Sequence, residues 1–198
     1  MTNITAERIG DYIVKVVVDE DPVNPRDDCN LGKMFCAHRR YALGDGTFDK
    51  ADHNGRVHTS WSEVRDFLMR EFDTAVILPL YLYDHSGITI STAPFHCPWD
   101  SGQVGFILAT KEEVREEFGV KRISAKLREK VADILRYEVS AYDSYIGGSY
   151  CGYAIYKVSV CDHGEEHTEF IDSCFGYDDS DIALEDGKAE VARLTETA

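Results

Sequence analysis

Short apolar runs rich in β-branched and aromatic residues recur along this chain between polar turns. The first, YIVKVVVD at residues 12–19, predicts a strand in the centre of a sheet. Similar runs predict further strands, and residues 33–43 fit either a strand or a short helix. The predicted strands lie at residues 75–83, 88–92, 102–109, 150–161 and 168–174. The last two flank a polar turn and therefore predict a hairpin.

Apolar residues at helical spacing predict helices in three segments. They lie at residues 60–72, 111–118 and 124–146. The first two have capping-box pairs at their starts, Ser60 with Glu63 and Thr110 with Glu113. The tail from residue 178 onward predicts an acidic helix with a weak apolar face, which Gly187 weakens further.

The order of these segments predicts an α+β fold with a mostly antiparallel sheet and helices packed mainly on one face, because hairpin-type turns outnumber helical crossovers. With 198 residues, 43% of them hydrophobic, the chain suits a single globular domain over residues 1–198 with an acidic C-terminal segment. Pro79 removes a ladder donor and so indicates a sheet edge, a bulge or a strand break. Residues 47–58 are expected to form a polar loop.

The net charge of −15 is unevenly distributed. Residues 1–60 hold ten acidic and eight basic residues, whereas residues 151–198 hold twelve acidic and only three basic ones. Such a field repels nucleic acid and attracts basic surfaces, although solubility alone also explains it. No export signal and no apolar run of about 18 residues occur, so we expect a cytoplasmic protein with no membrane partner. The six cysteines are then expected to be reduced thiols.

Most of the reactive side chains fall in two turns of the segment 79–107. Asp84, His85, Cys97 and Asp100 contain the parts of a thiol triad. An enzyme would require Asp84, His85 and Asp100 to converge around an open pocket. Turn residues of these types also have a purely structural explanation, since they hydrogen-bond their own backbone.

Several weaker features have structural explanations that we favour. The basic cluster His38-Arg39-Arg40 is expected to pair with the acidic loop at residues 19–28, and Trp99 is expected to cover the core. Four pairs could ligate zinc, but paired clusters at zinc-finger spacing are absent from the sequence, so we predict no metal and no cofactor. The four pairs are Cys36-x-His38, His96-Cys97, Cys161-x-His163 and His163-x3-His167.

The segment PLYLYDHSGITIST, followed by CPWDSGQVGFI, resembles an uncharacterised family of proteins encoded by bacteriophages and other mobile elements. The resemblance extends to DEDPVNPRDDCNLGKMFCAHRRYALGD, GVKRISAKLREKV and CGYAIYKV, and covers most of residues 12–176. Members of that family carry a tryptophan near Asp28-Cys29, so Cys29 departs from the pattern and is a poor catalytic candidate. The resemblance implies a small cytoplasmic protein acting in a bacterial host cell.

In that setting, acidic proteins without a catalytic motif often inhibit host nucleic-acid machinery, as anti-CRISPR and anti-restriction proteins do by placing carboxylates where phosphates would sit. Our leading hypothesis is therefore a binding protein whose partner is a host protein or nucleoprotein complex with a basic surface, with no direct nucleic-acid binding. Eight residues form the proposed acidic array: Asp162, Glu165, Glu166, Glu169, Asp172, Asp178, Asp179 and Asp181.

Two alternatives stay open. The first is a hydrolase or nuclease-like enzyme that uses Asp84, His85, Cys97 and Asp100. The second is a structural or assembly role without a ligand. No oligomeric state is predicted from the sequence.

Overall fold

The computed structural model describes residues 2–46 and 60–196. Its helices and two antiparallel sheets confirm the predicted α+β class. The contacts divide the chain into two compact units, which we call the terminal unit (residues 1–23 and 148–198) and the central unit (residues 24–147). That the whole chain forms one domain stays a prediction. The polar loop expected at residues 47–58 lies outside the described residues.

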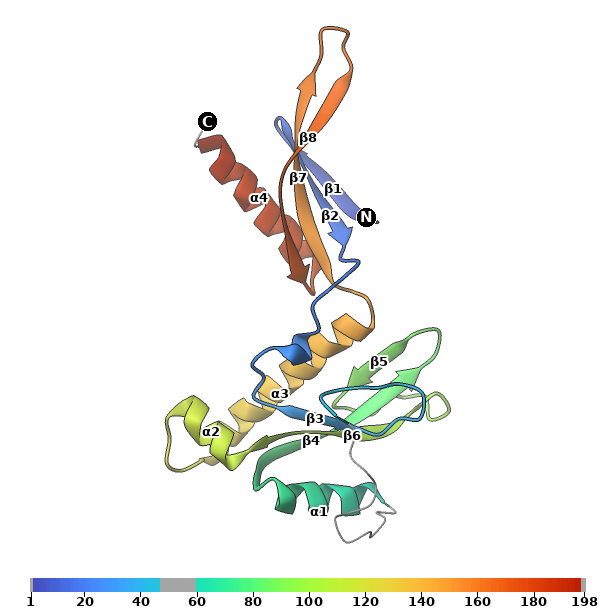
Figure 1. Ribbon diagram of the computed structural model, residues 1–198, viewed down its shortest axis with the longest axis vertical. Helices are drawn as coiled ribbons and strands as arrows, with labels where there is room; N and C mark the ends of the chain where they lie inside the picture. Colours follow the sequence, from blue (N-terminus) through green and yellow to red (C-terminus); the bar gives the residue numbers. More distant parts are fainter. Residues whose placement is uncertain (1, 47–59, 197–198) are drawn as a thin grey trace. The chain divides into compact units, whose positions relative to one another are not determined.

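The terminal unit combines both ends of the chain in one sheet of order β1-β2-β7-β8, with a helix packed on it (Figure 1). Its elements are β1 (Asn3–Ile9), β2 (Tyr12–Val18), β7 (Cys151–Val160), β8 (Glu166–Tyr177) and α4 (Ser180–Glu196). As predicted, β2 lies inside the sheet and β7 and β8 form a hairpin. The sequence pattern did not predict β1, whose residues are almost all exposed at the sheet edge.

The core of the terminal unit forms where α4 approaches the sheet closely. Val14, Tyr153 and Ile155 from the strands pack with Val191 from the helix. Gly187 allows this approach, because a Cβ atom there would lie only 2.6 Å from Cγ1 of Val14. The glycine that weakens the predicted helix is therefore the residue at which that helix meets the sheet.

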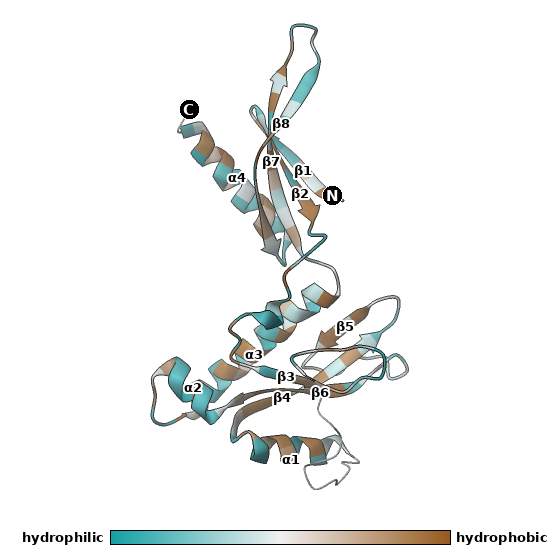
Figure 2. Ribbon diagram, in the orientation of Figure 1, coloured by the Kyte–Doolittle hydropathy of each residue, from teal (hydrophilic) through white to brown (hydrophobic). Residues whose placement is uncertain are grey.

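The central unit contains the second sheet, of order β3-β6-β4-β5, and the other helices. Its strands are β3 (Lys33–Cys36), β4 (Thr74–Asp84), β5 (Ile88–Ser91) and β6 (Ser101–Thr110). Its helices are the 3-10 turn η1 (Pro25–Asp27) and the α-helices α1 (Trp61–Glu71), α2 (Lys111–Phe118) and α3 (Ala125–Ile146). Hydropathy colouring shows that β4 is mainly hydrophobic whereas α2 is mainly hydrophilic (Figure 2).

Helices cover both faces of this second sheet. Neighbouring residues of β6 point to opposite faces, so Ile107 packs in the cluster that contains α3 residues while Phe106 packs in the cluster that contains α1 residues. Figure 1 shows α1 and α3 on these two sides. In the terminal unit, by contrast, α4 supplies the core of one face.

The predicted helix starts are confirmed by their caps. The Ser60 hydroxyl accepts a hydrogen bond from the backbone of Glu63, and Thr110 with Glu113 forms a complete capping box. Pro79 lies where β4 pairs with β6 on one side, while β5 pairs only with residues 81–84 of β4. A bulge between Leu80 and Tyr81 follows directly, so the ladder is interrupted beside the proline, as predicted.

Candidate functional site

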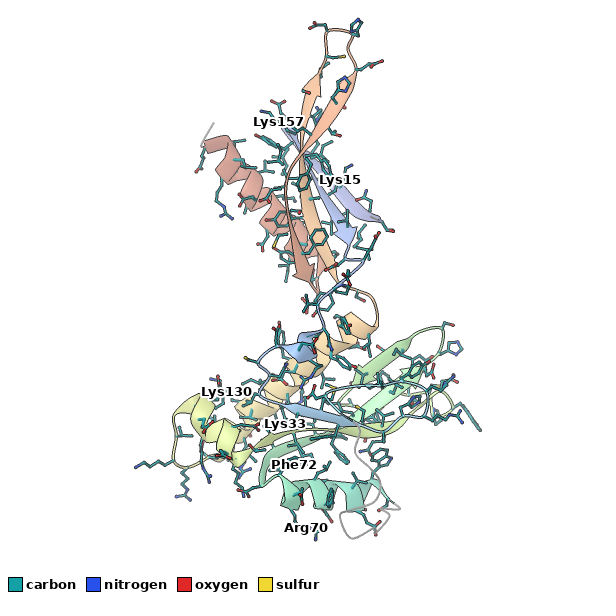
Figure 3. All side chains as sticks on the ribbon, in the orientation of Figure 1. Lys15, Lys33, Arg70, Phe72, Lys130 and Lys157 are labelled. Carbon is teal, nitrogen blue, oxygen red and sulfur yellow. The ribbon has the colours of Figure 1, made fainter. Side chains whose placement is uncertain are left out.

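All eight carboxylates of the acidic array are exposed on the terminal unit, along β8, in the turns that flank it and in the first turn of α4. The β7–β8 hairpin extends past β2, whose pairing with β7 ends at Lys157. We call residues 159–167 the hairpin tip. The first half of β8 is mainly hydrophilic (Figure 2), and Figure 3 shows Lys157 on the strand that leads to the tip.

The acidic array follows an edge strand and its two ends, and it occupies both faces of the sheet. Glu166 lies opposite Val160 and Glu169 opposite Lys157, which places these two carboxylates on opposite faces. Asp162, Glu165, Glu166 and Glu169 lie at the hairpin end of β8, and Asp172 follows in its middle. The other three carboxylates lie past its far end, at residues 178, 179 and 181. A strand of twelve residues is ~40 Å long at about 3.3 Å per residue. The array therefore fits an elongated surface on a partner better than a compact pocket.

Most of the array is not neutralised by the protein itself. Glu166 pairs with Arg8 at 2.8 Å, and both side chains are about half exposed. No other ion pair involves an array residue within residues 2–46 and 60–196. Because an exposed ion pair contributes little stability, Arg8 can release Glu166 to a partner at small cost.

Part of the array has a structural role at the start of α4. The Asp179 side chain accepts hydrogen bonds from the backbone of Asp181 at 2.8 Å and of Ile182 at 3.3 Å. Acidic side chains are also favoured at a helix N-terminus by the helix dipole. The helix start therefore explains some of the carboxylates at residues 178–181, but not those at the hairpin tip.

The two units differ more in net charge than residues 1–60 and residues 151–198 do. The terminal unit holds seventeen acidic and five basic residues, an excess of twelve negative charges. The central unit holds nineteen acidic and sixteen basic residues, an excess of only three. The strongly negative field therefore belongs to the terminal unit.

The second candidate site brings its four residues together in the central unit. The backbone of Asp84 donates to the carbonyl of Asp100 at 2.8 Å, which joins the β4–β5 turn to the loop before β6. One carboxylate oxygen of Asp100 lies 3.4 Å from Nδ1 of His85 and accepts a hydrogen bond from the Cys97 thiol at 3.6 Å. His85 and Cys97 therefore meet at one carboxylate oxygen of Asp100, whereas Asp84 joins them through its backbone and not through its carboxylate.

Two residues that the sequence did not assign to this cluster hold Asp84 in place. The Arg40 guanidinium pairs with one of its carboxylate oxygens, and the Tyr41 hydroxyl donates to the other at 3.2 Å. The expectation that the basic cluster around Arg40 pairs with the acidic loop at residues 19–28 is therefore wrong for Arg40. A contact between residues 44 positions apart leaves no local signal in the sequence.

The arrangement lacks two features of a nucleophilic thiol site among the described residues. A reactive cysteine needs a base that takes its proton and a cation that stabilises the thiolate. Here the Cys97 thiol donates to a carboxylate, and the cation in the cluster, Arg40, pairs with Asp84. The geometry suits a hydrogen-bonded loop better than covalent catalysis by Cys97.

Trp99 does not cover the core, in contrast to the expectation, since 92% of it is exposed. The nearby Phe95 is partly buried, and its ring centre lies 5.7 Å from that of Tyr83. Residues 98–100 form a turn at the surface, which carries the indole away from the sheet. Trp99 is thus an exposed aromatic side chain directly beside Asp100.

The predicted zinc pairs are not all brought together. Burial, with help from the charge of Asp45, raises the pKa of the Cys36 thiol to about 12, and His38 stacks on Tyr41 at 5.0 Å instead of meeting Cys36 as a ligand. In the described part of the chain, one group places three possible metal ligands within 4.8 Å of one another: Cys161, Glu165 and His167.

Comparisons of the chain with protein-family models, curated proteins and solved structures find no match. Of the helices formed by the described residues, none has the length and apolar character needed to cross a membrane.

Proposed function

We propose that this chain is an acidic binding protein of bacteriophage type that inhibits a host defence complex by occupying its basic nucleic-acid site. The partner is a host protein or nucleoprotein complex, and the contact surface is the acidic array along β8. The proposal rests on one observation. A unit with an excess of twelve negative charges exposes eight carboxylates on an edge strand and in the segments that flank it, and only Glu166 among them has an ion-pair partner in the described residues.

The physical basis is competition for positive charge. Proteins that hold nucleic acid neutralise its phosphates with lysine and arginine side chains, and these grooves attract any negative surface of matching shape. An elongated row of carboxylates fits a groove that follows a nucleic-acid backbone. Long-range attraction also accelerates association, and salt screens it over a Debye length of about 10 Å at 0.1 M.

The test is capture of partners from a host extract with the full chain, at increasing salt and with added nucleic acid. We expect the captured complex to handle nucleic acid, to dissociate steeply with salt, and to be displaced by its own DNA or RNA. Partner identity is established by mass spectrometry. Capture that is insensitive to both salt and nucleic acid would contradict the proposal.

A charge-matched pair of variants locates the contact. The array variant is D162N/E169Q/D178N, which leaves Cys161, Glu165 and His167 intact. The control is E112Q/E116Q/E117Q, which removes the same number of exposed carboxylates from α2 of the central unit. We expect weaker capture and a shallower salt dependence for the array variant only. Equal loss in both variants would show that net charge, and not this surface, determines binding.

A second candidate function is a hydrolase or nuclease-like activity at the Asp100 cluster, and the contact of 3.4 Å between His85 and a carboxylate oxygen of Asp100 favours it. This function requires hydrolysis of ester, peptide or nucleic-acid substrates that is lost in D100N and H85Q. The control C29S removes an exposed thiol that is distant in sequence from the Asp100 cluster, and it should leave the activity unchanged. Absence of turnover, or equal turnover in D100N, would exclude it.

A further inference from the structure

The loop of the β7–β8 hairpin is closed by hydrogen bonds that involve Cys161. Its backbone N–H donates to the carbonyl of Glu165 at 3.0 Å, and its carbonyl accepts from the N–H of Gly164 at 2.9 Å. Gly164 has a φ of 82°, a conformation that glycine adopts without strain. These bonds fix Cys161 directly opposite Glu165 across the hairpin.

Strand periodicity then adds a third side chain to the same face. Residues two apart on a strand point to the same side, so His167 follows Glu165, and residues opposite each other also share a face. The thiol, the carboxylate and the imidazole of Cys161, Glu165 and His167 consequently lie within 4.8 Å of one another. His163, which the sequence spacing offered as a partner for Cys161, is not a member of this group.

We propose that Cys161, Glu165 and His167 form a binding site for a divalent transition-metal ion of the zinc class at the hairpin tip. The ligand set determines the metal: thiolate and imidazole select zinc and its neighbours, whereas calcium and magnesium require oxygen ligands throughout. Three protein ligands leave one position of a tetrahedral site for water or for a group from a partner.

The geometry needs little adjustment to hold the ion. Ligand atoms around a tetrahedral zinc are about 3.5 Å apart, given metal–ligand distances of about 2.0–2.3 Å. In this structure the three ligand atoms lie within 4.8 Å of one another. Glu165 and His167 are exposed, so their side chains can rotate to bring the ligand atoms closer, while the hairpin hydrogen bonds hold the backbone. The short, closed loop therefore supplies a partly preorganised site.

The surroundings favour a bound cation. The carboxylates of Asp162 and Glu166 add negative potential beside the site. Arg8 is the cation that pairs with Glu166, and it contacts that carboxylate and not the three ligands.

The site does not depend on the proposed function, because neither its ligands nor its test involve a partner protein. The experiment titrates the reduced full-length chain with Co²⁺, which replaces zinc and reports its ligands by absorption. We expect a sulfur-to-cobalt charge-transfer band that saturates at one equivalent and disappears when Zn²⁺ is added. Native mass spectrometry should show one metal per monomer.

Variants identify the ligands. C161S should abolish the charge-transfer band. H167Q and E165Q should each weaken Zn²⁺ binding at least about tenfold, which is the lower end of the loss typical for outer-shell contacts. The matched controls C174S and H163Q change an exposed thiol in β8 and the other histidine of the tip, and should bind as the unmodified chain does. Circular dichroism verifies that each variant is folded.

Three results would overturn the site. The first is no charge-transfer band in the unmodified chain at one equivalent of Co²⁺. The second is an unchanged band in C161S. The third is a greater loss of Zn²⁺ affinity in H163Q than in H167Q, which would show that His163, and not His167, supplies the imidazole ligand.

Discussion

Arg26 and Glu138, 112 positions apart in the sequence, form an ion pair of 3.1 Å inside the central unit. Only 3% of the Arg26 side chain and 9% of the Glu138 side chain are exposed. Arg26 also makes two bonds of 2.7 Å to Asp45, and Glu138 accepts from the backbone of Leu31 at 2.8 Å. Burial would lower the pKa of Arg26, but the two carboxylates outweigh it and raise that pKa. The pair thereby links the loop before β3 to helix α3.

We expect E138Q to destabilise the protein by about 3 kcal/mol, because removal of one partner leaves a buried charge incompletely compensated. The glutamine keeps an acceptor for the Leu31 N–H but loses the second oxygen, which accepts from Arg26, so the loss reports the ion pair together with its hydrogen bond. Urea unfolding measures the difference. The control E129Q, on an exposed position of the same helix, should change stability by less than about 0.5 kcal/mol. Similar losses in both variants would show that the ion pair has no special role.

The capping box of α2 predicts a dependence of stability on pH. Burial raises the pKa of Glu113, but hydrogen bonds from Lys33 and Thr110 outweigh it and hold the pKa below its ordinary value. Lys33 lies 2.7 Å from the carboxylate and is labelled in Figure 3. A lowered pKa in the folded state gives stability that is present above the unfolded pKa and is lost as the pH falls through the folded one.

The variant E113Q isolates this charge, since glutamine can still complete a capping box. We expect it to cost about 0.5 kcal/mol at pH 7, in keeping with a partly exposed ion pair, and to cost progressively less as the pH falls below about 4. T110A, which removes the cap together with one hydrogen bond to the Glu113 carboxylate, should cost about 1 kcal/mol at pH 7. A pH-independent effect of E113Q would contradict the assignment.

The contact between α4 and its sheet makes a prediction against helix propensity. Alanine at position 187 should favour the helix by about 1 kcal/mol, but its Cβ would lie 2.6 Å from Val14 and 3.1 Å from Tyr153. We therefore expect G187A to destabilise the protein by about 1–2 kcal/mol. The control A189G, at an exposed position of α4, should cost only the propensity difference. A stabilising G187A in thermal unfolding would show that α4 can move away from the sheet.

The parts of the fold that sequence analysis predicted are those with local causes. Capping pairs such as Thr110 and Glu113 act within one turn, and apolar runs reveal strands whose faces are buried. The edge strand β1 was missed because its exposed residues show no alternation. Other features depend on residues that are far apart in the sequence. The terminal unit forms because β2 pairs with β7, more than a hundred residues later, and Asp84 is held by the distant Arg40.

The candidate sites follow the same division. The exposed acidic residues could be found from composition, because charged side chains are rarely buried. The metal ligands could not be found from spacing alone, since the strand period places His167, and not His163, beside Cys161. Trp99 was misplaced because a large aromatic residue is more often buried than exposed, and nothing local to the sequence marks the exception.

Thiol labelling tests the burial pattern and the hairpin site together. Cys36 and Cys151 are buried, and burial is the main cause that raises the pKa of each thiol, so both should resist a thiol reagent while the protein is folded. The other four cysteines are exposed or partly exposed. We expect four thiols to react rapidly in the native protein and all six after unfolding, as counted by the absorbance of released reagent.

Zn²⁺ should reduce the native count from four to three, because a metal-bound thiolate is shielded from the reagent. Peptide mapping should identify the protected residue as Cys161, and the C161S variant should give three reactive thiols with or without the metal. Protection of Cys97 instead would place the metal at the Asp100 cluster in the central unit. Rapid labelling of Cys36 would mean that the core of that unit opens easily, and that the buried Arg26–Glu138 pair does not hold α3 against the loop.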